Sequence, residues 1–289
     1  MQGGTGLNRF ARQFPARFFD VGIAEQHAVS MAAGMARGGY RPYFAVYSTF
    51  LQRAYDQIVH DVCLQNLPVC ILSDHVGLVG DDGKTHHGVL SVPMLMSIPN
   101  LTLLAPRDTR QIRQAVRATL KLDGPCVVQY PKEGIEPYAQ NVTGEPFAVG
   151  KWQTLIPGGQ DAVILAYGRM TQNAIQASEL LVQRGLSVGV IDCCSLKPLD
   201  MDCLRALFER KAKIVTIEEG EMIGGFGSEI ARVCVEENAD APVQIIGLEN
   251  RFITHGSVPE LLRECGLTPE QLADRIEEIA GDKENSHVG

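Results

Sequence analysis

The chain has 289 residues, of which 45% are hydrophobic and 21% are charged, a composition typical of a globular protein with room for two ordinary domains. Its net charge of −8 comes without a basic cluster, so we expect small molecules or proteins as partners and no nucleic acid. The sequence has neither an apolar run of the roughly 20 residues that cross a membrane nor an N-terminal secretory signal, so we expect no membrane contact.

Eight cysteines are scattered along the chain, and no two of them form a C-x-x-C pair. Most lie inside apolar runs, as in Pro68-Val-Cys70 and Ile191-Asp-Cys-Cys194. Buried, reduced thiols are typical of cytoplasmic proteins, whereas disulfides are rare there. We therefore predict a cytoplasmic protein whose cysteines form neither disulfides nor a zinc site.

In the first half, apolar strand-like runs alternate with amphipathic segments, which predicts an α/β fold. No strand is predicted within residues 1–18. The predicted helices are 24–37, 50–65 with Ser48 or Thr49 as its cap, 92–96, and 109 to about 122 with Asp108 as its cap. The predicted strands are 42–47, 67–73, 101–105 and 126–130. Residues 74–88 show no periodicity and contain four glycines, so we predict a long functional loop.

The second half begins after a stretch rich in Pro and Gly. Its predicted strands are 162–167, 187–191, 213–218 and 243–247, and its predicted helices are 171–184, 199–209, 228–237, 259–266 and 269–280. The predicted fold is therefore two doubly wound α/β domains, of which the second is the smaller. We assign residues 1–135 to the first domain, 136–159 to a linker, 160–281 to the second domain and 282–289 to a polar tail.

Glu25 begins an apolar helix directly after Ile23 and Ala24. Apolar surroundings favour the neutral form of a carboxyl group, so Glu25 could exchange a proton with a ring nitrogen of a ligand. The alternative is that Glu25 only complements the dipole of its helix. Taken by itself, the position of Glu25 favours this second interpretation.

The long loop contains Asp82, His86 and His87. Adjacent histidines point in different directions, so we expect at most one of them to face a ligand. A metal site is an alternative, but no third ligand follows at a suitable spacing. We therefore predict that this loop forms hydrogen bonds to a polar substrate.

Tyr47, Phe50 and Arg53 lie where a predicted strand meets a predicted helix, and ligands of doubly wound sheets bind at the carboxyl ends of strands. Phe50 by itself would more simply be a core residue. Residues 224–228, Gly-Gly-Phe-Gly-Ser, lie between a strand and a helix but lack the G-x-G-x-x-G spacing. We predict that they form a tight packing turn and bind no dinucleotide.

Several of these segments together resemble the 1-deoxy-D-xylulose-5-phosphate synthases of the transketolase-like thiamine diphosphate family. The resemblance rests on residues 19–28, 47–57, 64–68 and 77–88 in the first half and on residues 197–200, 218–220 and 224–228 in the second. It implies a pyrimidine-binding thiamine diphosphate domain followed by a smaller transketolase C-terminal domain.

The resemblance also implies roles for residues that bind the cofactor and substrates. Glu25 matches the glutamate that protonates the aminopyrimidine ring of thiamine diphosphate and so helps form its carbanion. Phe50 matches the aromatic residue that stacks on this ring, with Ile23 also at the cofactor. Asp82 and His86 match the pair that contacts the donor and the developing alkoxide.

Four further positions correspond to substrate-contacting residues of the family. Tyr47 and Arg53 match residues that line the substrate channel. His75 and Lys132 stand where the family has phosphate-binding arginines, and a histidine, mostly neutral at pH 7, binds phosphate less well. The implied reaction decarboxylates pyruvate and adds the two-carbon unit to glyceraldehyde 3-phosphate, with weaker phosphate recognition or a different acceptor.

The family's motif for diphosphate and Mg²⁺, a Gly-Asp-Gly followed by a downstream Asn, does not occur in this sequence. The resemblance therefore implies a partner, an N-terminal diphosphate-binding subunit that carries the Mg²⁺ ligands, together with contacts between copies of this chain. Three alternatives stay open: a transketolase subunit with another sugar or anionic acceptor, a β-type subunit of a 2-oxo acid dehydrogenase, and an inactive truncated partner.

Overall fold

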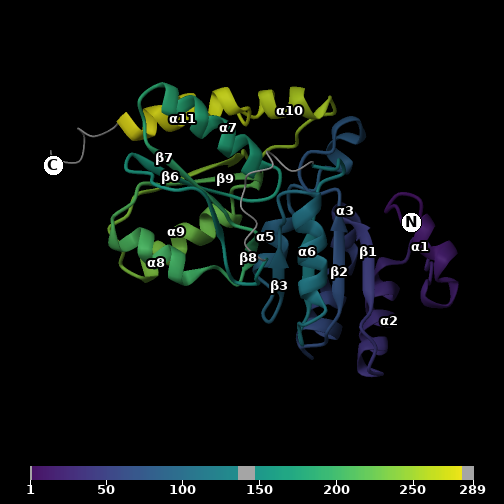
Figure 1. Cartoon of the computed structure of the whole chain (residues 1–289). Helices are drawn as coiled ribbons and strands as arrows, with labels where there is room; N and C mark the ends of the chain where they lie inside the picture. Colours follow the sequence, from purple (N-terminus) through teal and green to yellow (C-terminus); the bar gives the residue numbers. More distant parts are fainter. Residues whose placement is uncertain (1, 136–146, 282–289) are drawn as a thin grey trace.

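The structure, a computed structural model, describes residues 2–135 and 147–281 as two five-stranded sheets flanked by helices (Figure 1). The prediction of two α/β domains is confirmed. Residues 136–146 of the predicted linker and the predicted tail 282–289 lie outside the described residues. Among the described residues, no helix combines the length and apolar character needed to cross a membrane.

The first sheet has the strand order β1-β2-β4-β3-β8. Its strands are β1 (Tyr43–Tyr47), β2 (Cys70–Asp74), β3 (Thr102–Leu104), β4 (Cys126–Gln129) and β8 (Ser195–Lys197). The first four are parallel, and β8 arrives from the second half of the chain and pairs antiparallel with β3. The sequence did not predict β8, because a three-residue strand that joins a distant sheet has no periodic signal of its own.

Both faces of the first sheet are buried, because successive residues of a strand point to opposite faces. Ile71, Leu103 and Val127 belong to one apolar cluster, to which helix α2 (Glu25–Arg37) contributes. The residues next to them in each strand belong to a second cluster, to which helix α6 (Thr109–Thr119) contributes. Helix α6 begins as predicted, with the Asp108 side chain accepting a hydrogen bond from the backbone N–H of its third residue.

The predicted single helix at 50–65 is wrong in its start and its regularity. The segment consists of α3 (Ser48–Leu51), a 3₁₀ turn η2 (Gln52–Ala54), α4 (Tyr55–Gln57) and a π-helical turn η3 (Ile58–Cys63). Ser48 does not cap it. Its hydroxyl is buried and donates instead to the carbonyl oxygen of His75 at 2.7 Å. This tertiary contact occupies the hydroxyl that a capping role would need.

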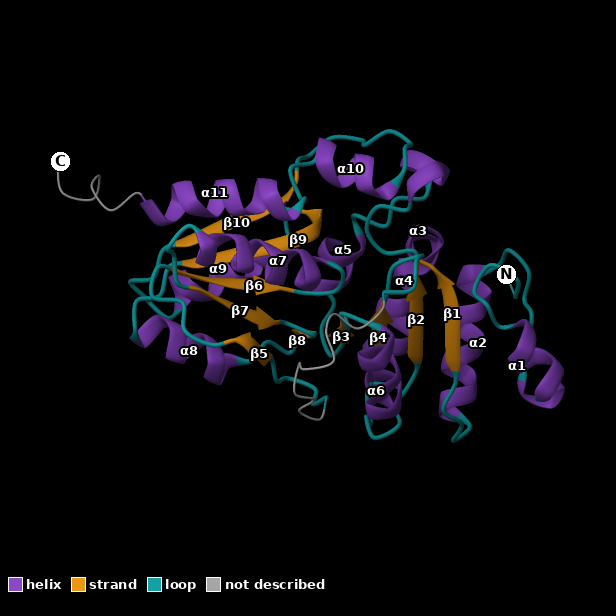
Figure 2. Cartoon of the chain, turned by 45° about the horizontal axis from the view of Figure 1, so that its top comes forward, coloured by secondary structure: helices purple, strands orange, loops and turns teal. Residues whose placement is uncertain are grey.

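The N-terminal segment contains helix α1 (Asn8–Gln13) and a 3₁₀ turn η1 (Pro15–Arg17), and residues 2–18, the described part of this segment, form no strand, as expected. Helix α1 lies at the outer edge of the first domain, beyond β1, in both views (Figures 1 and 2). Helix α5 (Ser91–Met96) was predicted to within one residue and lies toward the second domain, where it contacts β9.

The second sheet has the order β10-β9-β6-β7-β5. Its strands are β5 (Gln153–Ile156), β6 (Ala162–Ala166), β7 (Val188–Asp192), β9 (Ile214–Glu221) and β10 (Val243–Leu248). All neighbours pair in parallel except β5, which runs antiparallel to β7 (Figure 2). Strand β5 lies within residues 136–159, so the later part of the predicted linker belongs to this sheet. Its composition pointed to a linker because prolines and glycines lie on both sides of this four-residue strand.

Helices cover both faces of the second sheet. Helices α7 (Met170–Gln183) and α11 (Pro269–Gly281) pack in one apolar cluster, and α8 (Met201–Glu209) and α9 (Phe226–Glu236) pack in the other. Helix α10 (Val258–Glu264) follows β10 and begins with a capping box at Ser257. This domain is therefore doubly wound, as predicted.

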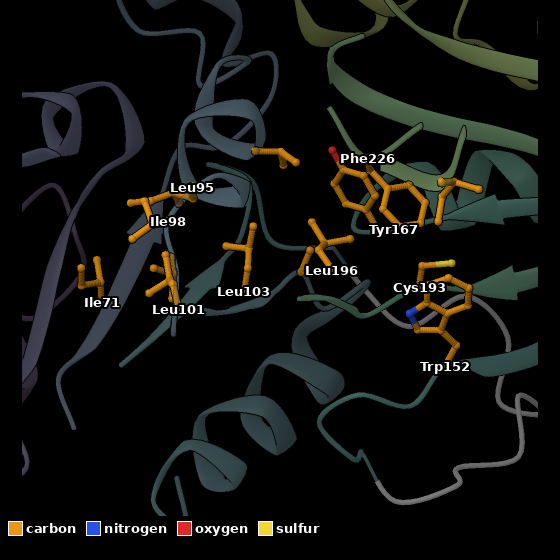
Figure 3. Packing of buried hydrophobic residues seen from close by; sticks show 14 of the residues in the cluster. Ile71, Leu95, Ile98, Leu101, Leu103, Trp152, Tyr167, Cys193, Leu196 and Phe226 are labelled. Carbon is orange, nitrogen blue, oxygen red and sulfur yellow. The ribbon is translucent and has the colours of Figure 1, made fainter. Parts of the chain in front are cut away.

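One apolar cluster continues from the first domain into the second. Figure 3 shows its labelled side chains in a row that starts at Ile71, Leu95, Ile98 and Leu101, passes Leu103 and Leu196, and ends at Tyr167, Phe226, Cys193 and Trp152. Lys197 adds polar contacts, because its ammonium group donates to the carbonyl oxygens of Met96 and Ile98. The two domains share a common core, which fixes their relative position.

Candidate functional site

The candidate site lies at the carboxyl ends of β1 and β2, where doubly wound sheets bind their ligands. Tyr47 and Asp74 end these strands and are register partners. Aromatic contacts extend from this point: the ring of Tyr47 stacks on His75 at 3.7 Å and lies 5.5 Å from Phe50, whose ring meets His86 edge-on at 5.5 Å. The structure therefore brings together four of the residues predicted for the site.

Glu25 is the first residue of α2, and its side chain is 8% exposed. A guanidinium N–H of Arg53 donates to Glu25 Oε1 at 3.1 Å, and the Arg53 Cζ lies 4.9 Å from the centre of the Phe50 ring. Glu25 therefore has a cationic partner, where the sequence predicted apolar surroundings alone. Among the described residues, nothing donates a hydrogen bond to its second oxygen, so this oxygen can serve a ligand.

Asp82 and Lys132 form an ion pair at the mouth of the site, with 2.6 Å between Lys132 Nζ and Asp82 Oδ2. Asp82 belongs to a 3₁₀ segment, η4 (Gly80–Thr85), and Lys132 follows β4. The hydrogen bond from Lys132 lowers the pKa of Asp82, and the same bond raises the pKa of Lys132. Each group therefore stays charged, and the lysine is already matched by a carboxylate.

His75 is buried between Tyr47 and Asp74. Its backbone has a φ of 61°, in the left-handed region, and its N–H donates to Asp74 Oδ1 at 2.7 Å. Its ring Nδ1 lies 3.0 Å from the same oxygen without the geometry of a hydrogen bond, so this nitrogen has spare capacity. Burial, reinforced by Asp74 and Asp82, raises the pKa of Tyr47, which keeps its phenol protonated as a donor.

The two adjacent histidines point in different directions, as predicted. His86 faces the Phe50 ring, and its Nδ1 lies 2.9 Å from the Thr85 hydroxyl. His87 is buried and points to the second domain. The backbone N–H of Val79 donates to His87 Nδ1, so the proton lies on Nε2, which donates to the carbonyl of Thr254 at 2.9 Å. His86 is thus available to a ligand, and His87 has a structural position.

Ile23, predicted to contact the cofactor, is 83% exposed and forms no described contact with the residues above. The segment Gly224–Ser228 packs tightly, as predicted, but only its first two residues form a turn, because α9 begins at Phe226. The carboxylate of Glu218 occupies the start of α9, where it accepts hydrogen bonds from the backbone N–H groups of Phe226 and Gly227.

Ser48 and Asp74 also border the site and were not predicted to do so, although both lie at strand ends, where such residues can be sought. In the described part of the chain, no group of three or more His, Cys, Asp and Glu residues could hold a metal ion. The site can offer a carboxylate, an aromatic face, a phenol and an imidazole to an organic ligand.

Two family models match the chain. The pyrimidine binding domain of transketolase matches residues 1–136, and the C-terminal domain of transketolase matches residues 150–272. Among curated proteins, the chain is 42% identical to the 1-deoxy-D-xylulose-5-phosphate synthase of Alkaliphilus oremlandii over 98% of its own length and 45% of that protein. It is 44% identical to the enzyme of the same name from Shouchella clausii, over 96% of its own length and 44% of that protein. The chain thus spans less than half the length of these relatives.

Solved structures resemble it as well. One is a split-gene transketolase, described as an inactive beta4 tetramer, with 31% identity and a TM-score of 0.84 over 94% of this chain and 86% of that chain. Transketolase from Campylobacter jejuni has the same fold, with 18% identity and a TM-score of 0.75 over 90% of this chain and 39% of that one.

Proposed function

The chain belongs to the transketolase family, and from this premise we propose that it is one subunit of a thiamine diphosphate-dependent two-carbon transferase of the 1-deoxy-D-xylulose-5-phosphate synthase type. The observation that carries the proposal is the contact of Glu25, Arg53 and Phe50 at the carboxyl edge of the first sheet. Asp82 and His86 lie on the loop that borders this contact, and the identity of above 40% to curated synthases supports the same activity.

The residues fit the pyrimidine end of the cofactor. Glu25 has an oxygen without a described donor, and Phe50 supplies an aromatic ring that contacts the same Arg53. When bound, thiamine diphosphate supplies a carbon nucleophile and an electron sink for the two-carbon unit. Glu25 holds and transfers the proton at the ring nitrogen, and Arg53 holds the Glu25 carboxylate in place. Ile23 contributes exposed apolar surface at the start of the same helix.

The remaining residues act on the substrates, which we propose to be pyruvate and glyceraldehyde 3-phosphate. Asp82 and His86 orient the donor and donate or accept hydrogen bonds where charge develops on its oxygen. Tyr47, His75 and Lys132 line the side on which the acceptor enters. This cytoplasmic reaction would serve isoprenoid biosynthesis.

We assign the diphosphate and Mg²⁺ ligands to a separate N-terminal subunit. Two observations support this: the described residues contain no group of side chains that could hold a metal ion, and the split-gene transketolase chain matches this one over 86% of its length.

A second candidate is a transketolase-type transfer to an acceptor without a phosphate group. The observation that favours it is the state of the two acceptor-side groups: Lys132 is paired with Asp82, and His75 is buried against Tyr47. Neither side chain presents an unmatched cation to a phosphate, which arginine would bind with two parallel hydrogen bonds.

The proposal is tested by mixing this chain with an N-terminal diphosphate-binding subunit, thiamine diphosphate and Mg²⁺, and by measuring CO₂ release from pyruvate with glyceraldehyde 3-phosphate present. We expect turnover only when both chains are present. A mixture that binds the cofactor, releases no CO₂ and transfers two-carbon units from a ketose would favour the second candidate. A mixture that binds the cofactor and does neither would refute both.

A further inference from the structure

The loop that carries Asp82 and His86 is attached to the second domain at its start. The backbone N–H of Leu78 donates to Glu219 Oε1 at 2.8 Å, across 141 residues of sequence. Leu78 and Glu219 are both buried, so this hydrogen bond is sheltered from water. The neighbouring Gly77 lies so close that a Cβ atom there would be 2.7 Å from Glu219 Cδ. The backbone of the loop is thus pressed against one carboxylate of β9.

The Glu219 carboxylate is itself held from within the second domain. A guanidinium N–H of Arg169 donates to the same oxygen, Oε1, at 3.2 Å, and both side chains are nearly buried. Burial raises the pKa of Glu219, and the Arg169 charge and the Leu78 N–H oppose that rise. A single oxygen therefore links the guanidinium at the start of α7 to the loop of the first domain.

A second contact secures the next residue of the loop. The N–H of Val79 donates to His87 Nδ1 at 3.1 Å, and His87 Nε2 donates to the carbonyl of Thr254 in the second domain. Two consecutive loop amides, those of Leu78 and Val79, are therefore bonded to the second domain, one directly and one through His87. The segment with Asp82 and His86 lies between Val79 and His87.

We propose that Glu219 is a positioning residue for the catalytic loop, through which the second domain sets where Asp82 and His86 meet the substrate. The proposal rests on the proposed function, because it assigns a purpose to a loop of that same site. Glu219 touches neither substrate nor cofactor and acts through the Leu78 amide. Catalytic groups that are misplaced by about 1 Å can lose roughly 100-fold in rate, so such an anchor affects turnover from a distance.

The direct test is hydrogen exchange at the Leu78 and Val79 amides, measured on this chain without partner or cofactor. Glu219→Ala removes the acceptor of a buried N–H and should lower protection at Leu78 by roughly 10- to 100-fold. Glu219→Gln should keep most of the protection, because its side-chain oxygen can still accept from both Leu78 and Arg169. Gly77→Ala disrupts the same contact from the side of the first domain and should lower protection at Leu78 as Glu219→Ala does. It provides a second test if Glu219→Ala does not fold.

Glu218→Gln is the matched control, since Glu218 is the adjacent buried glutamate and its backbone contacts, at Phe226 and Gly227, stay within the second domain. It should raise exchange at the start of α9 and leave the loop unchanged. Unchanged loop protection in both Glu219→Ala and Gly77→Ala would overturn the proposal. So would a loss of protection that spreads through β9 and α9 and is not centred on the loop.

In the complex with the partner subunit, Glu219→Ala should lower kcat at least tenfold with little change in KM for pyruvate, as expected for groups misplaced in the transition state. A fall in affinity for substrate with unchanged kcat would contradict a positioning role. If the mixture fails to bind thiamine diphosphate, the proposed function fails, whereas the exchange result on the chain by itself still decides whether Glu219 anchors the loop.

Discussion

Replacing Glu25 by Gln separates the two roles that this residue could have. Glu25 is the first residue of α2, and its side chain, 8% exposed, accepts one hydrogen bond from Arg53, whose side chain is 53% exposed. Glutamine keeps the shape and an acceptor oxygen for Arg53, but it cannot ionise and so cannot take up or release a proton. The fold should therefore lose little, and turnover should lose much.

The expected magnitudes follow from this geometry. An ion pair with a half-exposed arginine contributes up to about 1 kcal/mol, and an acidic group in the first turn of a helix adds about 0.3–1 kcal/mol. The free energy of unfolding should therefore fall by at most about 2 kcal/mol, which corresponds to a decrease in Tm of roughly 2–8 °C. Loss of general acid–base function should lower turnover by about 10²–10⁴-fold.

The assay compares Tm by calorimetry, assembly by size-exclusion chromatography, and turnover in the reconstituted complex. Glu229→Gln is the matched control, because Glu229 also lies in the first turn of a helix, α9, and pairs with Arg232. Both variants should lose similar stability, and only Glu25→Gln should lose turnover. Equal turnover in the two variants would mean that Glu25 only complements its helix dipole, and the site assignment would be refuted.

His75→Arg should lower KM for a phosphorylated acceptor roughly tenfold in steady-state kinetics, because arginine is a charged, bidentate donor to phosphate. An unchanged or raised KM would contradict a phosphate-binding role for this position. Burial raises the pKa of Glu218 from 4.5 to about 7. Between these two pH values the folded state binds more protons than the unfolded state, so the free energy of unfolding should fall by a few kcal/mol as the pH rises across this range. Glu218→Gln should flatten that dependence in thermal melts from pH 5 to 8, and parallel curves would contradict the assignment. Gly88→Ala should lower the free energy of unfolding by about 1–3 kcal/mol, because its Cβ would lie 2.2 Å from the Ser48 hydroxyl oxygen. Gly34→Ala is the control, since Gly34 has open space around it, and it should not lower Tm. An equal Tm in the two variants would refute the packing argument.

Elements with a strong periodic pattern were predicted closely, because their own residues determine their form. Helix α6 begins at the expected Asp108 cap, and helix α2 begins within one residue of its prediction. The failures are elements that depend on distant partners. Strands β5 and β8 have four and three residues and pair with β7 and β3, and Ser48, predicted as a possible cap, instead donates its hydroxyl to His75 in another segment.

In the candidate site, too, local contacts were predicted and contacts between distant segments were not. Tyr47, Phe50 and Arg53 were grouped correctly from their spacing alone, because all three lie on one strand-to-helix junction. Contacts between distant segments, such as Arg53 with Glu25, gave no signal in the sequence. The anchoring role of Glu219 was missed for the same reason, since its loop partner lies in the other domain.

Thiamine diphosphate binding decides whether this chain holds only part of a cofactor site. It can be measured by titration calorimetry with Mg²⁺ present, first on this chain and then on its mixture with an N-terminal diphosphate-binding subunit. We expect no binding to the chain by itself and stoichiometric binding to the mixture, because we propose that the two chains hold opposite ends of the cofactor. Tight binding to the chain by itself would contradict the assignment of the diphosphate site to a partner. Absence of binding in the mixture would contradict the proposed function.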